Sequence, residues 1–258
     1  MVHGKLFLDM KVMVAVKRVI DPYVTVRVRS DNLGVETLHV KHSMNPFDEI
    51  ALEEAVRCLE NNTVNDVLLV SIGPSQNKEV LMHGLALGAS RAMLIETNLV
   101  LQGLPIAKIL SCIAQEEQPD LIVLGKQAID ADGAQTAAML SALLGWPQAL
   151  GVSSLRMDES RYVVSCETDS GSETWALQRP AVISVDLRLN QPRHVGLMQI
   201  MKAKQKPFFT RALDELAIHI EQQTQVLGVR AASRRTKGIK VDSVGQLVDK
   251  LRYEANVL

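Results

Sequence analysis

Short apolar runs alternate with stretches of helical periodicity along most of the chain. The runs are rich in valine, isoleucine and leucine, a composition typical of strands that are buried on both faces. They lie at residues 10–17, 66–72, 91–95, 121–125 and 181–185. The intervening pattern predicts helices at residues 45–59, 77–87, 105–117 and 135–144. This alternation predicts an α/β fold, with an open, mostly parallel sheet and helices on both faces.

The predicted helices carry recognisable start and stop signals. Asn45 is a favourable N-cap, Pro46 suits the first helical position, and Asp48 complements the positive end of the helix dipole. Gly88 and Gly145 follow two other helices, where glycine readily adopts the conformation that ends a helix. These residues set the boundaries of the elements more closely than hydrophobicity alone.

Two further regions are predicted to add antiparallel strands. Valine alternates with polar residues over 24–29, and a turn leads to a predicted hairpin partner at 35–40. Later, short strands at 153–157, 161–168 and 173–178 are joined by turns of Asp, Ser and Gly. We therefore divide the chain into an α/β domain with a β-hairpin addition (10–186), an irregular segment (187–206) and a C-terminal arm (207–258), which ends in a short helix.

Composition argues against several classes of function. The 258 residues carry a net charge of −1, so no basic surface for nucleic acid is expected. Aromatic residues make up only 3%, which disfavours base-stacking platforms. The cysteines Cys58, Cys112 and Cys166 are far apart, which suits a reducing compartment. No apolar run is long enough to span a bilayer, and residues 1–9 are too short for a signal peptide.

The most informative polar stretch follows the apolar run at 121–125 and leads into a predicted helix near Thr136. In an open parallel sheet, ligands bind at the carboxyl ends of strands, and amides at a helix start bind phosphate. The stretch contains neither G-x-G-x-x-G nor G-x-x-x-x-G-K-[ST]. The pattern alone therefore leaves two interpretations, a phosphate-binding loop and an ordinary strand-to-helix connection.

No catalytic or metal-binding set is predicted. Asp130 and Asp132 are close in sequence, but two acids in one loop are more often a solvated turn, and no catalytic histidine or third ligand lies near them. The six histidines are scattered and show no metal-ligand spacing.

The segment 193–206 combines an apolar cluster with nearby lysines. Leu197, Met198, Ile200 and Met201 form the cluster. One interpretation is a short amphipathic helix that packs into the core. The other is an exposed anchor for a partner protein, since leucine and flexible methionines adapt to varied surfaces and lysines attract acidic ones.

Several longer matches point to a family. They are VAVKRVID (14–21), KHSMNPFDEIALEEAVR (41–57), PDLIVLGKQAIDAD (119–132), GWPQA (145–149), DLRLNQPR (186–193) and IMKAK (200–204). In this order they resemble the beta subunit of electron-transferring flavoproteins. The resemblance starts at Met10, weakens between 208 and 232, and returns over 234–251.

The resemblance implies a nucleotide-binding fold of the adenine nucleotide hydrolase type and a heterodimer with an alpha subunit. It implies a FAD that the alpha subunit mainly holds and this chain helps to enclose, with Phe47 at the position of an aromatic ring near the flavin. It also implies a structural AMP. The matching cofactor positions are Ala15, Asn45, Pro46, Phe47, Asp48, Ile72, Gly125, Lys126, Gln127, Ala128, Ile129, Asp130, Ala131, Asp132, Gly133, Ala134, Gln135 and Thr136.

The resemblance also implies a role for 187–206, which matches the family's recognition loop for dehydrogenases. Leu197 matches its anchoring leucine, while Met198 stands where proline is common. The residues implied in partner binding are Arg193, Leu197, Met198, Ile200, Met201 and Lys202. The arm 207–258 is implied to pack on the alpha subunit.

The implied function is that of an electron carrier without catalytic residues of its own. It would take electrons from acyl-CoA and related dehydrogenases and pass them to a quinone oxidoreductase at the membrane, in the bacterial cytoplasm or the mitochondrial matrix. Two alternatives stay open: a flavin-bifurcating beta subunit with a second FAD or NADH, and an ATP-using α/β enzyme. Bulky Phe47 should crowd a second flavin, and no phosphate-gripping Gly/Ser loop supports the second alternative.

Overall fold

The computed structural model describes residues 10–158, 160–221, 223–233 and 237–258. Residues 1–9, which were predicted to be too short for a signal peptide, lie outside this set. The chain forms two compact units. The first comprises residues 10–25 with Thr37–Gln225, and the second comprises Val26–Glu36 with Val226–Leu258. In the second unit, α6 (Val244–Asp249) continues as a π-helix over Lys250–Glu254, which agrees with the predicted short helix.

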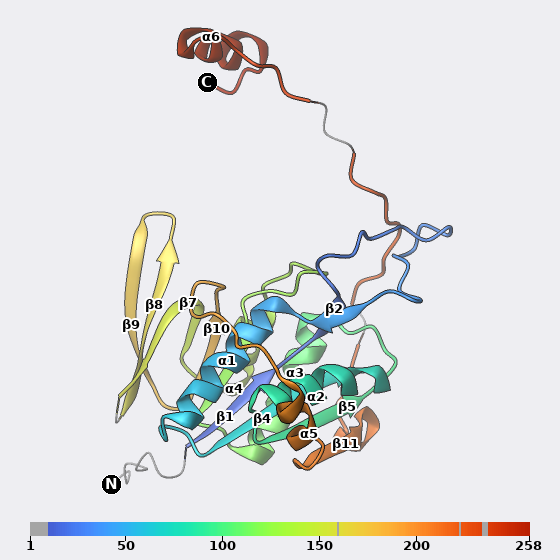
Figure 1. Cartoon of the computed structure of the whole chain (residues 1–258), viewed down its shortest axis with the longest axis vertical. Helices are drawn as coiled ribbons and strands as arrows, with labels where there is room; N and C mark the ends of the chain where they lie inside the picture. Colours follow the sequence, from blue (N-terminus) through green and yellow to red (C-terminus); the bar gives the residue numbers. More distant parts are fainter. Residues whose placement is uncertain (1–9, 159, 222, 234–236) are drawn as a thin grey trace. The chain divides into compact units, whose positions relative to one another are not determined.

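The first unit is built on one large sheet (Figure 1). Within the described residues it has nine strands, in the order β11-β5-β4-β1-β6-β10-β7-β8-β9. They are β1 (Lys11–Ala15), β4 (Asp66–Gly73), β5 (Arg91–Glu96), β6 (Leu121–Gly125), β7 (Gln148–Met157), β8 (Arg161–Thr168), β9 (Gly171–Gln178), β10 (Ala181–Val185) and β11 (Phe208–Ala212). Pairing is parallel from β11 through β10 to β7, and antiparallel among β7, β8 and β9. The predicted fold class is confirmed.

Helices cover both faces of the parallel part (Figure 1). They are α1 (Pro46–Glu60), α2 (Lys78–Leu87), α3 (Gly103–Glu117) and α4 (Thr136–Leu144), with a 3-10 turn at Ser75–Asn77 before α2. The strands alternate between two apolar cores. Val12 and Val14 face the core shared with α1 and α2, whereas Met13 faces the core shared with α3 and α4. This period of two explains why the buried strands read as continuous apolar runs.

Three features differ from the sequence prediction. The alternating valines over 24–29 form no regular strand, because only an isolated bridge joins Val28 to Val35. Instead, β2 (Arg18–Ile20) and β3 (His42–Met44) pair as a small antiparallel sheet. The segment predicted to be an arm from residue 207 begins with β11, which pairs with β5 and is followed by a 3-10 turn at Leu213–Leu216. Among the described residues, no helix is both long and apolar enough to cross a membrane.

Candidate nucleotide site and docking segment

The strand order reverses beside β1. The chain continues from β1 to β4 and β5 on one side of the sheet, whereas β6 and β10 lie on the other. Ala15 at the end of β1 is in register with Leu124 of β6, so the carboxyl ends of these two strands lie side by side. Ligands bind in the crevice at such a reversal. The predicted cofactor residues Ala15 and Gly125 are therefore at the expected edge.

The start of α1 ties the two strand ends together. The carboxylate of Asp48 accepts hydrogen bonds from the backbone N–H of Lys17 (2.8 Å) and of Gly125 (3.2 Å). The backbone N–H of Asn45 donates to the carbonyl oxygen of Lys17 (2.9 Å). Burial raises the pKa of Asp48 to about 7, although the same amide hydrogen bonds act to lower it. Asp48 thus acts as a buried clamp between β1 and β6.

Asn45 shapes the loop that follows β6. Its side-chain nitrogen donates to the carbonyl oxygen of Gln127 (2.9 Å), and its oxygen accepts from the N–H of Ile129 (3.1 Å). The residue is fully buried. It occupies the predicted N-cap position of α1 but makes no side-chain capping hydrogen bond there. Its amide supports the loop backbone from the interior, which is a role that the capping signal does not reveal.

The loop itself, residues 126–135, is largely exposed but its charges are partnered. Lys17 Nζ lies 2.7 Å from an oxygen of Asp130, and Gln127 donates to Asp132 (2.5 Å). Asp132 and Ala134 have positive φ values of 51° and 49°. Non-glycine residues are uncommon in this conformation, and turns of this kind gather backbone N–H groups into anion-binding hollows.

The loop ends at the start of α4. Gln135 is the N-cap of α4, but its side chain accepts no hydrogen bond from the first backbone amides of the helix. Thr136 is half-buried at the first helical position. A cavity of ≈ 340 Å³ opens beside Gln135 and Met139, with Gly103 of α3 and Ile220 on its other sides. An anion would meet the positive end of the α4 dipole here.

The remaining predicted cofactor residues lie at the same edge. Ile72 near the end of β4 is half-buried and, like Ala15, packs against the core under α3 and α4. Phe47 is only 9% exposed and lies behind Gly125. Hydrogen bonds therefore connect the segment around Asn45 and Asp48 to the loop after β6.

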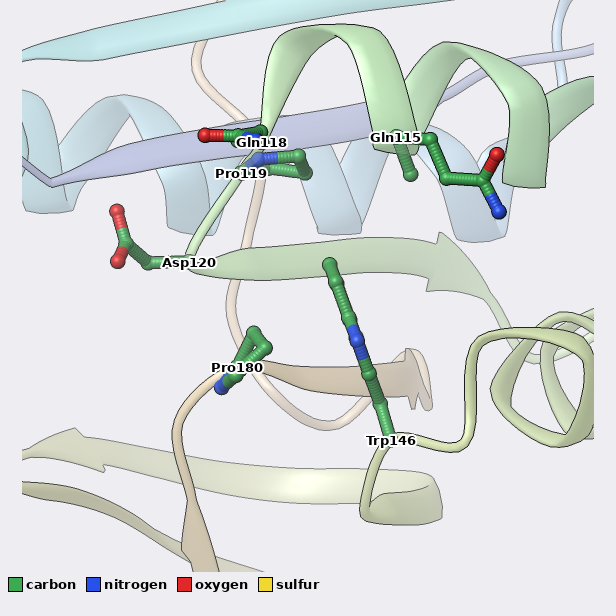
Figure 2. Close-up of a pocket in the computed structure, with 7 residues that line it drawn as sticks. Gln115, Gln118, Pro119, Asp120, Trp146 and Pro180 are labelled. Carbon is green, nitrogen blue, oxygen red and sulfur yellow. The ribbon is translucent and has the colours of Figure 1, made fainter.

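The opposite edge of the sheet has a different character. A pocket there is lined by Ala114, Gln115, Gln118, Pro119, Asp120, Trp146 and Pro180 (Figure 2). The Asp120 carboxylate points away from Trp146 in this view and accepts the N–H of Lys11 (3.0 Å), while its carbonyl accepts the hydroxyl of Tyr162 (3.0 Å). These contacts join strand starts. No cluster of His, Cys, Asp or Glu that could hold a metal ion occurs among the described residues.

The segment predicted to contact a partner contains a short helix, α5 (Leu197–Ala203). Leu197 is 76% exposed, Met198 70% and Met201 55%. The interpretation of this segment as a core helix is therefore wrong, although Ala203 is buried. Arg193, in contrast, is turned toward α1, where it pairs with Glu53 and Glu60. The apolar residues and Arg193 thus occupy different surroundings.

Sequence reasoning missed two residues at these sites. Lys17 joins the end of β1 to Asp130, and Glu53 is a buried carboxylate that receives Arg193. An acid on the apolar side of a predicted helix is the signal that identifies Glu53, because buried acids are almost always paired. Lys17 offered no comparable signal.

Asp48 is predicted to make the free energy of unfolding fall as the pH rises from about 4 to about 7. Its folded-state pKa of about 7 lies above the unfolded value of about 3.9. The stabilisation of the fold by Asp48 is therefore complete below about pH 4 and is lost as the pH rises to about 7. The loss is at most about 4 kcal/mol, since one pKa unit corresponds to about 1.4 kcal/mol. Urea unfolding at several pH values should show a shallower slope for Asp48→Asn than for the original protein. Glu53, whose pKa is lowered, titrates below this window. Parallel pH profiles for the two proteins would contradict the prediction.

A parallel α/β sheet whose strand order reverses beside an uncapped helix start is typical of nucleotide-binding proteins. A family model described as the electron transfer flavoprotein domain matches residues 32–216. The chain belongs to the electron transfer flavoprotein beta subunit family.

Relatives from distant organisms match almost end to end. The electron transfer flavoprotein subunit beta of Bradyrhizobium diazoefficiens is 48% identical over 96% of this chain and 100% of its own length. The mitochondrial subunit beta of Arabidopsis thaliana is 50% identical over 96% of this chain and 100% of its own length. The human subunit beta is 43% identical over 95% of this chain and 97% of its own length.

Proposed function

We propose that this chain pairs with an alpha subunit to form an electron transfer flavoprotein, binds AMP at the carboxyl edge of its sheet, and helps to enclose FAD. The alpha subunit holds most of the FAD. The supporting observation is the junction of β1, β6, α1 and α4, where the loop after β6 is held in shape by Asn45 and Asp48. The chain contributes position and environment and supplies no acid, base or nucleophile.

The residues at this junction fit an adenine nucleotide. Lys17 offsets the charge of Asp130, and the neutral amide of Gln127 holds the carboxylate of Asp132, so both loop acids have partners within this chain. The uncapped start of α4 offers amide donors, and the adjoining cavity gives room beside Gln135. We assign Ala15 and Ile72 to the apolar side of the site, and Gly125 to Thr136 to the phosphate side.

FAD would supply the redox chemistry, since flavins accept and release electrons. We assign Phe47 a supporting role behind the edge that faces the flavin. The exposed side chains of Leu197, Met198 and Met201, together with Lys202, form the docking surface for acyl-CoA and related dehydrogenases. A quinone oxidoreductase at the membrane accepts the electrons, and the carrier works in the bacterial cytoplasm or, in a eukaryote, in the mitochondrial matrix.

Co-expression tests this function directly. The chain alone is expected to purify without colour, and co-expression with its alpha subunit should give a yellow heterodimer, because the alpha subunit holds most of the FAD. Absorbance near the flavin bands of the two preparations is the measurement. A chain that purifies alone with one flavin per polypeptide would overturn the assignment.

Nucleotide extraction from the same heterodimer separates the alternatives. AMP in the acid extract, with one FAD per heterodimer, supports the proposal. A second FAD per heterodimer would indicate a bifurcating subunit, and turnover of added ATP would indicate an enzyme.

A further inference from the structure

An ion-pair cluster around the buried carboxylate of Glu53 joins the docking segment (residues 187–206) to α1. Glu53 is only 2% exposed, and its carboxylate accepts hydrogen bonds from Arg193 through Nε (2.9 Å), Nη2 (3.1 Å) and the backbone N–H (3.3 Å). Arg57 donates to the same carboxylate (2.7 Å). Burial opposes ionisation, but the hydrogen bonds from the two arginines outweigh it and lower the pKa of Glu53. Glu53 is therefore a charged group held by both guanidinium groups.

Further contacts fix the same end of the segment. Arg193 also pairs with Glu60, which lies about two turns beyond Glu53 on α1. Asn190 donates to the carbonyl oxygen of Ile50 (3.1 Å) and to Glu54 (2.9 Å). Arg57 donates to the carbonyl oxygen of Gln191 (2.9 Å). Residues 190–193 are thus attached along the outer side of α1.

The other end is fixed to α2. Lys206 Nζ donates to the carbonyl oxygens of Leu85 (2.9 Å) and Ala89 (2.6 Å), where α2 ends. Carbonyls at a helix end lack intrahelical partners and carry the negative end of the dipole, so a lysine is stabilised there. Between the two attachments, the side chains of α5 that face solvent include Leu197 and Met198.

We propose that Arg193 is a positioning residue that holds the docking segment in its binding shape. Its pairs with Glu53 and Glu60 fix one end of the segment, while Lys206 fixes the other. The inference rests on the docking role proposed above for Leu197. A segment that is already ordered loses less conformational entropy on binding. The ion pairs of Arg193 therefore strengthen docking without a direct contact to the partner.

The test uses Arg193→Lys in the intact heterodimer, a change that keeps the charge but removes the planar fork. Amide hydrogen exchange over 194–202 should become at least about threefold faster. The KM for a reduced acyl-CoA dehydrogenase should rise about fivefold or more, while kcat at saturating partner changes less than about twofold, because the cost falls on docking. Glu60→Gln removes only the ion pair of Arg193 with the exposed Glu60. It should raise the exchange rate and the KM in the same direction, by a smaller factor.

Arg211→Lys is the matched control, because Arg211 also pairs with a glutamate, Glu116, but lies on β11. It should leave exchange over 194–202 and the KM unchanged. Unchanged exchange in Arg193→Lys would overturn the proposal that Arg193 orders the segment, whatever happens to electron transfer. Faster exchange with an unchanged KM would overturn the positioning role. If Leu197→Ala also left the KM unchanged, the docking function itself would be wrong.

Discussion

Gly125→Ala is expected to lower the melting temperature by about 4–24 °C and to release any bound nucleotide. A Cβ at this position would lie 2.3 Å from Asp48 Oδ1, 2.6 Å from Phe47 Cβ and 2.9 Å from the Asp48 backbone nitrogen. The nearest groups are the first turn of α1, which cannot move without breaking the clamp between β1 and β6.

The size of this effect follows from two costs. Overpacking a core typically costs about 1–3 kcal/mol. Displacing Asp48 from the N–H of Gly125 leaves a buried polar group poorly paired, at about 1–3 kcal/mol more. For a chain of this length, each 1 kcal/mol shifts the melting temperature by about 2–4 °C. Thermal unfolding followed by circular dichroism measures the shift.

Gly133→Ala, in the loop that follows Gly125, is the matched control. No atom lies within 4 Å of the Cβ that would be added at Gly133, and its backbone does not adopt the left-handed conformation. The expected change in stability is below about 0.5 kcal/mol, as for other exposed positions. If Gly125→Ala melted with Gly133→Ala at the temperature of the original protein, the tight contact between β6 and α1 would be wrong.

The main sheet could be predicted from sequence because its strands are buried on both faces. Continuous apolar runs such as that of β6 leave little ambiguity, and glycines such as Gly88 and Gly145 marked the helix ends correctly. The apolar runs and the helix-ending glycines are each defined within a few residues, so the sequence predicts these elements without knowledge of distant contacts.

The strands that escaped prediction depend on partners far away in sequence. β11 contains Phe208 and Phe209 but lies at the sheet edge, where side chains are partly exposed and no regular alternation is required. β2 and β3 have only three residues each, too few to show a period. The valines at 24–29 had the right alternation, but a strand also needs a continuous neighbour, and Val28 finds only a single bridge.

The sequence predicted the residues of the candidate site, but it did not predict the contacts that they make in the fold. Asn45 carried a helix-capping signal, yet its amide binds Gln127 and Ile129, which are more than eighty positions further along the chain. Asp48 was expected to favour the helix dipole, yet it bridges two strand ends. Such roles follow from which elements meet in the fold, and a single sequence contains no direct record of those contacts.

Leu197→Ala is expected to slow partner-linked reduction by more than tenfold at sub-saturating concentrations of a dehydrogenase. Truncating an anchoring side chain that enters a partner's pocket costs roughly 2 kcal/mol of binding free energy. Each 1.4 kcal/mol is a factor of ten in affinity. Because Leu197 is 76% exposed in this chain, its removal leaves no cavity in the core. Melting temperature, bound nucleotide and chemical reduction by dithionite should therefore stay unchanged.

Leu38→Ala provides a control of equal chemistry, since Leu38 is 77% exposed but lies in the excursion between β2 and β3. Only the Leu197 variant should slow the reaction with the dehydrogenase, because only that leucine lies in the clamped segment between Arg193 and Lys206. Equal slowing in both variants would indicate a general effect of lost surface hydrophobicity. A Leu197 variant that melts earlier but transfers electrons at the original rate per folded molecule would place the docking surface elsewhere. The two measurements on one pair of variants therefore separate a contact with the partner from a contribution to the fold.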